Sequence, residues 1–402
     1  MTTPPSTATR PATEVGAARR WAMLAASTTA QAAAGITIHG PAFLIPVLVA
    51  DGGLSLAQAG LVAAAPTLGV TLTLVAWGAL ADARGERATL LVGLVLTAAL
   101  GGVAMAGGGV VALALALAAA GAAAASTASA SGRVVVGWFP PHRRGLAMGI
   151  RQMAQPAGVG IAAVTIAVVA ETRGVTAALG VPVAAALLAA ALVAAVVVDP
   201  PRPERREGSA PNPYREDGFL ARVHAVSVLL VVPQFLVWTF ALVWLVQDRG
   251  WSAAAAGTLV AVSQLLGALG RVAVGQLSDV VGSRIRPLRW VTVAAGISMA
   301  ALGLAAGLDA AVAVPLVVLA TVVTVADNGL AFTAVAERAG PFWSGRALGA
   351  QNTAQYLAAS AVPPVAGLLV AQAGYAAAFA LAALCPLAAV ALVPVRGERA
   401  LR

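Results

Sequence analysis

The stretch "GALADARGER", from Gly78 to Arg87, interrupts a long apolar run with a dense group of charged residues. A second copy, "GQLSDVVGSR", runs from Gly275 to Arg284, and both copies fit the frame G-x-L-x-D-x-x-G-x-R. The matched residues are Gly78 with Gly275, Asp82 with Asp279, Gly85 with Gly282, and Arg87 with Arg284. Two copies of one motif about half a chain apart indicate that the chain consists of two similar halves.

A second pair of similar stretches supports the same division. "RGLAMGIRQMAQ", from Arg144 to Gln155, matches "SGRALGAQNTAQ", from Ser344 to Gln355. The shared positions include Gly145 with Gly345, Gly149 with Gly349, and Gln155 with Gln355. Each of these stretches opens the fifth apolar segment of its half, so the repeat extends well beyond the charged motif.

Composition excludes a soluble protein. Of the 402 residues, 60% are hydrophobic and 10% are charged, whereas a soluble domain has roughly 25% charged residues. The apolar runs reach about 20 residues or more, enough for a helix to cross a hydrocarbon core of about 30 Å. They lack the alternation of a transmembrane β-barrel. The sequence therefore predicts an all-α membrane protein in a lipid bilayer.

Charge and cysteine usage exclude further classes. The net charge of +9 comes from arginines spread over the connections rather than over one basic face, which argues against nucleic acid as a partner. The single cysteine, Cys385, allows no intrachain disulfide, and we interpret it as a packing residue. We find no metal-ligand cluster, nucleophile motif or phosphate-binding loop, so we expect neither a metal nor a cofactor nor an enzyme.

The apolar segments divide into six before and six after a polar stretch in the middle of the chain. We expect spans near 21–49, 55–81, 88–107, 110–138, 145–170, 175–198, 221–247, 253–278, 289–308, 311–335, 346–371 and 374–395. The predicted domains are a disordered cytoplasmic tail at 1–20, a six-helix bundle at 21–198, a flexible cytoplasmic linker at 199–220, a second six-helix bundle at 221–395 and a tail at 396–402. The predicted fold is therefore all-α, with twelve transmembrane helices in two pseudo-symmetric six-helix bundles.

The positions of the arginines test this topology. Only Arg173 and Arg249 fall in connections on one side, and Arg133, Arg151 and Arg271 lie inside predicted helices, whereas all other arginines fall on the opposite side. Cytoplasmic connections are enriched in Lys and Arg. We therefore expect both termini and the linker to be cytoplasmic and the protein to be a multi-pass component of the inner (plasma) membrane.

The two charged motifs and the twelve spans resemble the major facilitator superfamily of transporters, whose signature loop G-x-L-x-D-x-x-G-x-R lies between helices two and three. "RVVVG", from Arg133 to Gly137, resembles a further signature near the end of helix four. This resemblance implies two rigid halves that alternate around a central substrate site. It also implies that Asp82 favours the outward-facing state as a conformational latch.

Elementary electrostatics supports a latch. A carboxylate at a helix junction can hold neighbouring helices by charge-assisted hydrogen bonds or by binding a helix N-terminus, and a small rotation would break these contacts. Glycines allow the tight turn and the close helix approach. The latch residues are predicted to be Gly78, Asp82, Gly85, Arg87, Gly275, Asp279, Gly282, Arg284 and Arg133. The alternative is that these charges only fix the topology of the loops.

Candidate substrate and proton residues are polar groups inside the helices expected to line a central cavity. A charge within a membrane segment costs about 2.5–3.5 kcal/mol on insertion scales, which makes a functional role the default hypothesis. The candidates are Gln31, His39, Arg151, Gln152, Gln155, Trp238, Arg271, Asp327 and Asn328. For His39 the alternative is a fixed hydrogen-bonding residue, and for Trp238 it is an interfacial anchor.

Asp327 is the main candidate for proton coupling. It lies about nine residues, or roughly 13 Å, from the predicted end of helix ten, and its short side chain cannot reach the surface. A carboxylate there could take up and release a proton during transport. The alternative is a static salt bridge with Arg271 or Arg133. Arg151 is the candidate for binding an anionic group of the substrate, because a guanidinium presents two donors to a carboxylate.

The sequence thus predicts a secondary transporter that works as a monomer on a small-molecule substrate and is driven by the proton gradient. Intramembrane arginines favour proton-coupled uptake of a small organic anion by alternating access. The alternative is proton-coupled efflux of drugs or other amphipathic compounds. A membrane-embedded enzyme and a transport-inert sensor are disfavoured.

Overall fold

The computed structural model describes residues 15–50, 53–201 and 211–399, and within these ranges the chain forms helices and no strand. Most of the predicted tail at 1–20 lies outside the described residues, as do residues 202–210 of the predicted linker and the end of the tail at 396–402. The first helix begins at Ala17. Arg19 and Arg20, which we had placed in the tail, are therefore part of that helix.

The first half contains six membrane-length helical segments. In chain order the elements are α1 (Ala17–His39), η1 (Gly40–Leu44), α2 (Ile45–Ala50), α3 (Leu56–Arg84), α4 (Glu86–Met105), α5 (Gly109–Trp138), α6 (Pro141–Gln152) and α7 (Ala154–Val196). The start of α3 shows how local sequence sets a boundary. Ser55 Oγ accepts the N–H of Gln58 while Gln58 Oε1 accepts the N–H of Ser55, a reciprocal cap that satisfies two free donors.

The second half repeats this arrangement. Its elements are α8 (Phe219–Gln247), α9 (Ala253–Val281), α10 (Ile285–Gly307), α11 (Ala313–Thr324), α12 (Asp327–Ala339), α13 (Ser344–Ala382), α14 (Leu384–Leu392) and η2 (Val395–Gly397). The tenth span is therefore interrupted between α11 and α12, and Asp327 is the first residue after the interruption.

Two glycines account for the number of spans. The described chain has 10 continuous stretches that are long and apolar enough to cross a membrane, and two of them, Pro141–Val196 and Ser344–Gly397, are about twice as long as needed. Gly174 in α7 (φ 82°, ψ 171°) and Gly374 in α13 (φ 80°, ψ 172°) take non-helical backbone conformations that side chains disfavour. Each divides its stretch into two spans, which gives the predicted twelve.

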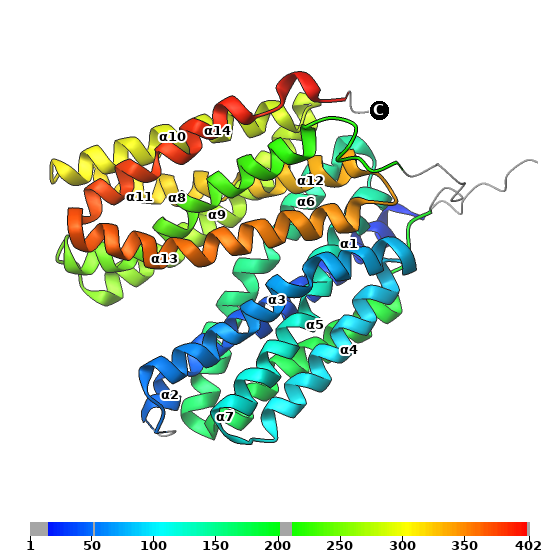
Figure 1. The fold of residues 1–402 in the computed structure, drawn as a ribbon, viewed down its shortest axis with the longest axis horizontal. Helices are drawn as coiled ribbons and strands as arrows, with labels where there is room; N and C mark the ends of the chain where they lie inside the picture. Colours follow the sequence, from blue (N-terminus) through cyan, green and yellow to red (C-terminus); the bar gives the residue numbers. More distant parts are fainter. Residues whose placement is uncertain (1–14, 51–52, 202–210, 400–402) are drawn as a thin grey trace, which may run out of the picture.

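The helices pack as two groups. In the first group α3 packs on α5, α1 on α7 and α4 on both α5 and α7; in the second, α13 packs on α8 and α10. The two groups touch mainly where α3 packs on α13 and α6 packs on α9, with further contacts of α5 and α6 with α12 and of α5 with α13. They meet at the end of the molecule that carries the chain ends and the linker, here called the linker side, and separate towards the opposite end, the far side (Figure 1).

The described end of the linker is held against the second half. Tyr214 stacks on His224 of α8, with ring centroids 5.8 Å apart, and its hydroxyl lies 2.9 Å from His224 Nε2. Burial raises the pKa of Tyr214 to about 12, so the phenol stays protonated at neutral pH. Asp217 pairs with Arg338 at the end of α12. These contacts attach the linker to the same side as the inter-half contacts.

Close packing inside the first half depends on small residues. A Cβ added to Gly121 of α5 would lie 2.2 Å from the backbone oxygen of Pro66 in α3, whereas a Cβ added to Gly102 of α4 would meet nothing within 4 Å. We predict that Gly121→Ala lowers thermal stability because the crossing helices must separate, at a cost of about 1–3 kcal/mol. Gly102→Ala is the matched control and should be neutral or stabilising. Equal unfolding temperatures for the two purified variants would contradict the packing argument.

Candidate functional site

Two polar junctions join the halves on the linker side. In the first junction, Asp82 at the end of α3 accepts hydrogen bonds from the backbone N–H of Gly345 (2.8 Å) and Arg346 (3.0 Å) and from Nε of Arg346 (3.0 Å). Because α13 begins at Ser344, these N–H groups lie in its first turn and have no acceptor within the helix. The carboxylate supplies that acceptor and also lies at the positive end of the helix dipole.

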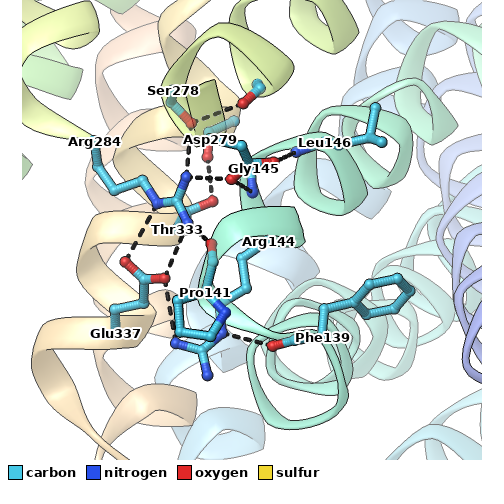
Figure 2. A network of polar contacts seen from close by, with 12 residues as sticks. Phe139, Pro141, Arg144, Gly145, Leu146, Ser278, Asp279, Arg284, Thr333 and Glu337 are labelled. Atoms are coloured by element: carbon cyan, nitrogen blue, oxygen red, sulfur yellow. Dashed lines mark hydrogen bonds and ion pairs between the residues drawn. The ribbon is translucent and has the colours of Figure 1, made fainter. Parts of the chain in front are cut away.

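The second junction repeats this geometry with the halves exchanged. Asp279 at the end of α9 accepts hydrogen bonds from the backbone N–H of Gly145 (2.9 Å) and Leu146 (2.8 Å) in α6, as Figure 2 shows. The side chains of Asp82 and Asp279 are each only 2% exposed. Each charged motif therefore binds the second repeated stretch of the opposite half.

Glycines bring the backbones into contact beneath these carboxylates. A Cβ added to Gly78 would lie 2.2 Å from the backbone oxygen of Gly345, and one added to Gly145 would lie 2.2 Å from that of Gly275. Side chains at these positions would force the helices apart. Four of the matched glycines therefore face each other at two helix crossings, Gly78 with Gly345 and Gly145 with Gly275.

Arginines complete both junctions, but differently. In the second junction Arg284 Nη1 lies 2.6 Å from Asp279 Oδ1, and its other nitrogens reach Glu337 (3.4 Å) and the backbone oxygen of Pro141. Arg144 of the first half also pairs with Glu337, at 3.3 Å (Figure 2). Arg284 therefore ties its own motif directly to the opposite half.

In the first junction the arginine beside the aspartate is Arg133 rather than Arg87, the arginine of the motif. Arg133 Nε lies 2.6 Å from Glu86 Oε1 and its Nη1 lies 3.4 Å from Asp82. Arg87 instead donates its backbone N–H to Asp199 (2.7 Å) and its Nη2 to the backbone oxygen of Ala194 (2.7 Å). Both contacts stay within the first half, so Arg87 lies outside the inter-half network.

The two inner motif glycines lie at the ends of the helices. Gly85 ends α3 with φ 102°, and a Cβ there would lie 2.5 Å from Asp199, so a side chain would displace the carboxylate that holds Arg87. Gly282 ends α9 in the left-handed conformation, at φ 67°. Each allows the sharp turn into the next helix, directly after the junction carboxylate.

Between the halves lies a small pocket of about 50 Å³ that we call the amide cage. Its walls carry seven carboxamide side chains: Gln31, Gln152, Gln155, Gln234, Asn328, Asn352 and Gln355. Gln355 Nε2 donates to Asn328 Oδ1 (3.1 Å), and Asn328 Nδ2 donates to Gln234 Oε1 (3.1 Å). The lining is completed by Arg151, Tyr356 and four apolar residues, Val231, Phe235, Phe332 and Ala359. The cage can accept and donate hydrogen bonds on many sides.

Our candidates missed Asn352, Gln355 and Tyr356, although the sequence contained a signal for the first two. In the repeat that pairs Gln155 with Gln355, Gln152 matches Asn352. The pseudo-symmetry places both pairs around one pocket. A residue proposed in one half should therefore have led us to its counterpart in the other.

Arg151 lines the cage but is already bonded within its own half. Its Nε donates to Ser131 Oγ (2.8 Å), its Nη1 to Gln152 Oε1 (2.8 Å) and its Nη2 to the backbone oxygen of Ala128 (3.0 Å). Only 2% of Arg151 is exposed. This geometry suits positioning of α6 against α5 better than the two-pronged binding of a carboxylate.

Beside the cage lies a larger cavity of about 380 Å³, which we call the lateral cavity. It is bounded by α7 and α9, one from each half, with residues of α8 and α11 behind them, and it shares Gln155 and Gln234 with the cage. Arg271 of α9 lies in its wall. Its Nη1 donates to the backbone oxygen of Gln152 (2.6 Å) and its Nε to that of Val325 (3.3 Å), while Nη2 has no hydrogen-bond partner among the described residues.

Asp327 lies close to this arginine. It is 1% exposed, and its Oδ1 is a buried oxygen without a hydrogen-bond partner in the described chain. Arg271 acts on it electrostatically, but no ion pair joins the two side chains, both of which are described. Arg133, the other partner that we considered, is paired with Asp82 and Glu86 instead. The static salt bridge that we considered as the alternative is not formed.

His39 and Trp238 meet across the halves. His39 ends α1 and lies 6.3 Å from Trp238 of α8 between ring centroids, and Phe235 packs on Trp238 at 5.1 Å. Trp238 lines the lateral cavity and Phe235 lines the cage. Trp238 therefore lies between the two compartments rather than on the outer surface as an anchor.

Comparison with known proteins identifies the family that has this architecture. The family model described as Major Facilitator Superfamily matches residues 25–363. The uncharacterized MFS-type transporter Rv2994 of Mycobacterium tuberculosis is 48% identical over 390 residues, which cover 96% of this chain and 87% of that protein.

Two solved structures share the fold. The transporter FucP in the outward conformation has a TM-score of 0.76 at 15% identity, covering 94% of this chain and 99% of FucP. The proton:xylose symporter XylE bound to 6-bromo-6-deoxy-D-glucose also has a TM-score of 0.76, at 17% identity and with 94% and 95% covered.

The first junction yields a prediction about the balance of conformations. Asp82→Asn removes the charge from hydrogen bonds worth about 1.5–3 kcal/mol each, which should move the equilibrium at least tenfold away from the state closed on the linker side. A cysteine at buried Leu348, in a Cys385→Ser background, reports this opening to an impermeant thiol reagent added on the linker side.

Asp199→Asn is the matched control, because Asp199 also accepts a backbone N–H at a helix start but does so within one half. Labelling should accelerate in Asp82→Asn and stay at the parent rate in Asp199→Asn. Equal rates in all three proteins would rule out the first junction as a control of the conformational balance.

Proposed function

The chain belongs to the major facilitator superfamily and is a secondary transporter, and on this premise we propose that it couples the uptake of a small organic anion to the entry of protons. The observation that carries this proposal is the pair formed by Arg271 and Asp327. The first has an unpartnered guanidinium nitrogen in the wall of a cavity, and the second has a buried, unpartnered carboxylate oxygen behind it.

Arg271 is the anion-binding residue in this proposal, in place of Arg151. Its Nη2 makes no hydrogen bond among the described residues and can donate to a substrate carboxylate, whereas every nitrogen of Arg151 already donates within its own half. A charge-assisted bond in a cavity of low polarity is stronger than one in water. Arg271 also holds the carbonyl of Gln152, so the anion binds to a group that touches both halves.

Asp327 supplies the proton site. The positive charge of Arg271 can stabilise either the substrate anion in the lateral cavity or the carboxylate of Asp327. When a substrate anion takes that charge, Asp327 keeps only the backbone N–H groups at the start of α12 as stabilising partners, and a buried charge with so little compensation is costly. Uptake of a proton by Asp327 removes this cost, so anion and proton bind together and leave together.

The two junctions act as the latch in this cycle. We place the linker side in the cytoplasm because nearly all connecting arginines lie there. The structure then corresponds to an outward-facing state in which Asp82 and Asp279 hold the cytoplasmic side closed. Rocking of the halves would break both junctions and open the cage to the cytoplasm. We propose that a single chain is sufficient, since both junctions and both compartments form within it.

The second candidate is proton-coupled efflux of amphipathic compounds. It is favoured by the lateral cavity, whose walls include many apolar residues of α7 and α9. The same residues would bind the cargo, and only the direction of the proton and substrate gradients would differ. Transport assays in the two directions distinguish the candidates.

Proteoliposomes give a direct test of coupling. With a panel of small organic anions, acid outside should drive accumulation by the wild type, and uptake should rise as the external pH falls because the proton is a co-substrate. Asp327→Asn should lose this stimulation but keep exchange of labelled for unlabelled substrate, since the neutral amide stands in for the protonated acid. Asp309→Asn, at an aspartate whose side chain is 87% exposed, is the control and should behave as wild type. Full stimulation by the proton gradient in Asp327→Asn would remove this residue from the coupling mechanism.

A further inference from the structure

The lateral cavity is elongated, with its charged group at one end. On α9 its wall is formed by Ala261, Gln264, Leu265, Ala268 and Arg271, which lie on one face of the helix because they recur at the spacing of a helical turn. Gln264 is the one polar residue of this face beside Arg271. From Ala261 to Arg271 the helix rises by about 15 Å. The cavity therefore extends along α9 away from Arg271, towards the far side of the molecule.

The wall opposite α9 is also apolar along this length. α7 contributes Pro156, Val159 and Gly160, and α8 contributes Trp238. Glycine, alanine and proline leave room for an occupant while offering it no hydrogen bonds. The space is thus shaped by missing side-chain volume on both helices.

The polar groups elsewhere in the wall are only partly engaged. Thr321 Oγ1 donates to the backbone oxygen of Val317 (2.8 Å) and Thr324 Oγ1 to that of Ala320 (2.7 Å), one turn earlier in α11. Gln234 Oε1 accepts from Asn328, whereas the side-chain amides of Gln155 and Gln264 make no hydrogen bond among the described residues. Because most of the lining is apolar, a sugar or a short hydroxy acid would still leave several hydroxyls without partners, which is costly away from water.

We propose that the transported anion is an amphiphile whose acidic group binds Arg271 Nη2 and whose hydrocarbon chain lies between α7 and α9, pointing towards Ala261. This inference rests on the proposed function, because it assigns a substrate class to the same arginine. The size of the cavity, about 380 Å³, lies at the lower end of the roughly 300–1,000 Å³ of small-molecule sites, which suits a single chain of medium length.

Alkanesulfonates are suitable probes, because they stay anionic at neutral pH and do not cross bilayers as neutral acids. Binding of ethane-, butane-, hexane- and octanesulfonate would be measured by calorimetry on the full chain in nanodiscs, with empty discs subtracted. Each added methylene that enters the cavity should lower Kd about fourfold, which corresponds to ~0.8 kcal/mol per buried CH₂.

Substitutions at the two ends of the cavity test the binding of the hydrocarbon chain and of the acidic group separately. Ala261→Phe fills the end of the cavity remote from Arg271. In this variant the Kd should stop falling at a shorter chain length, while the Kd of the short sulfonates stays unchanged. Val262→Phe is the matched control one residue along α9, at a side chain outside the lining of this cavity, and it should leave the series unchanged. Arg271→Gln should weaken every member by a similar factor, at least tenfold, because the head group is common to all.

The outcomes distinguish this inference from the proposed function. Binding that does not depend on chain length, or that changes equally in Ala261→Phe and Val262→Phe, overturns the amphiphile assignment even if short anions are transported with protons. Chain-length-dependent binding that requires Arg271, without proton-driven uptake of ethanesulfonate or butanesulfonate, supports the assignment and overturns the coupling instead. Failure of every sulfonate to bind overturns both.

Discussion

The arrangement of the whole molecule depends on two buried aspartates that bind the backbone of the opposite half. Asp82 accepts the N–H groups of Gly345 and Arg346, and Asp279 accepts those of Gly145 and Leu146. These bonds form only because glycines let the helix backbones approach below the carboxylates. They hold one end of the two bundles together, and the separation at the other end follows. These polar bonds lie at one end of the molecule, beside a buried apolar cluster that includes Met148 of the first half and Leu348 of the second, so a rigid rotation of the halves would break them together.

The pseudo-symmetry of the two halves is close in the backbone and looser in the side chains. In the second half the motif arginine, Arg284, bridges Asp279 and Glu337, whereas in the first half Arg133 of α5 pairs with Asp82 and Glu86. Both solutions place a guanidinium beside a buried carboxylate, which lowers the cost of burying the charge. In the second junction Arg284 itself reaches the opposite half, at Pro141, whereas in the first junction the arginine that joins the halves is Arg346, which pairs with Asp82.

Arg271 connects this closed side to the interior. Its α9 backbone packs on Gly149 of α6, just beyond the second junction, and its side chain holds the carbonyl of Gln152, where α6 ends. The same side chain lies in the wall of the lateral cavity and acts on Asp327, at the interruption between α11 and α12. An interrupted helix leaves backbone and side-chain groups unpaired within the membrane, which is acceptable only where they face a cavity or another polar group. One arginine thus lies at the contact between the halves and in the wall of the cavity, and it acts electrostatically on the buried acid.

Much of the architecture was determined by the sequence alone. Lengths of apolar segments, the asymmetry of the arginines and two repeated stretches predicted twelve spans in two similar halves, because these are local properties of helices in a bilayer. The pairing of the repeats with each other across the halves could not be predicted, since nothing in a sequence states which helices cross at which glycine. For the same reason the sequence, which pointed to Arg151 as the anion-binding residue and to Arg271 as a possible partner of Asp327, could not show how either arginine is bonded. The tertiary structure favours Arg271 in the proposal, because every nitrogen of Arg151 donates within its own half, whereas Arg271 Nη2 makes no hydrogen bond among the described residues and its side chain lies in a cavity wall. Hydrogen-bond saturation depends on contacts between distant segments, and those contacts exist only in the folded chain.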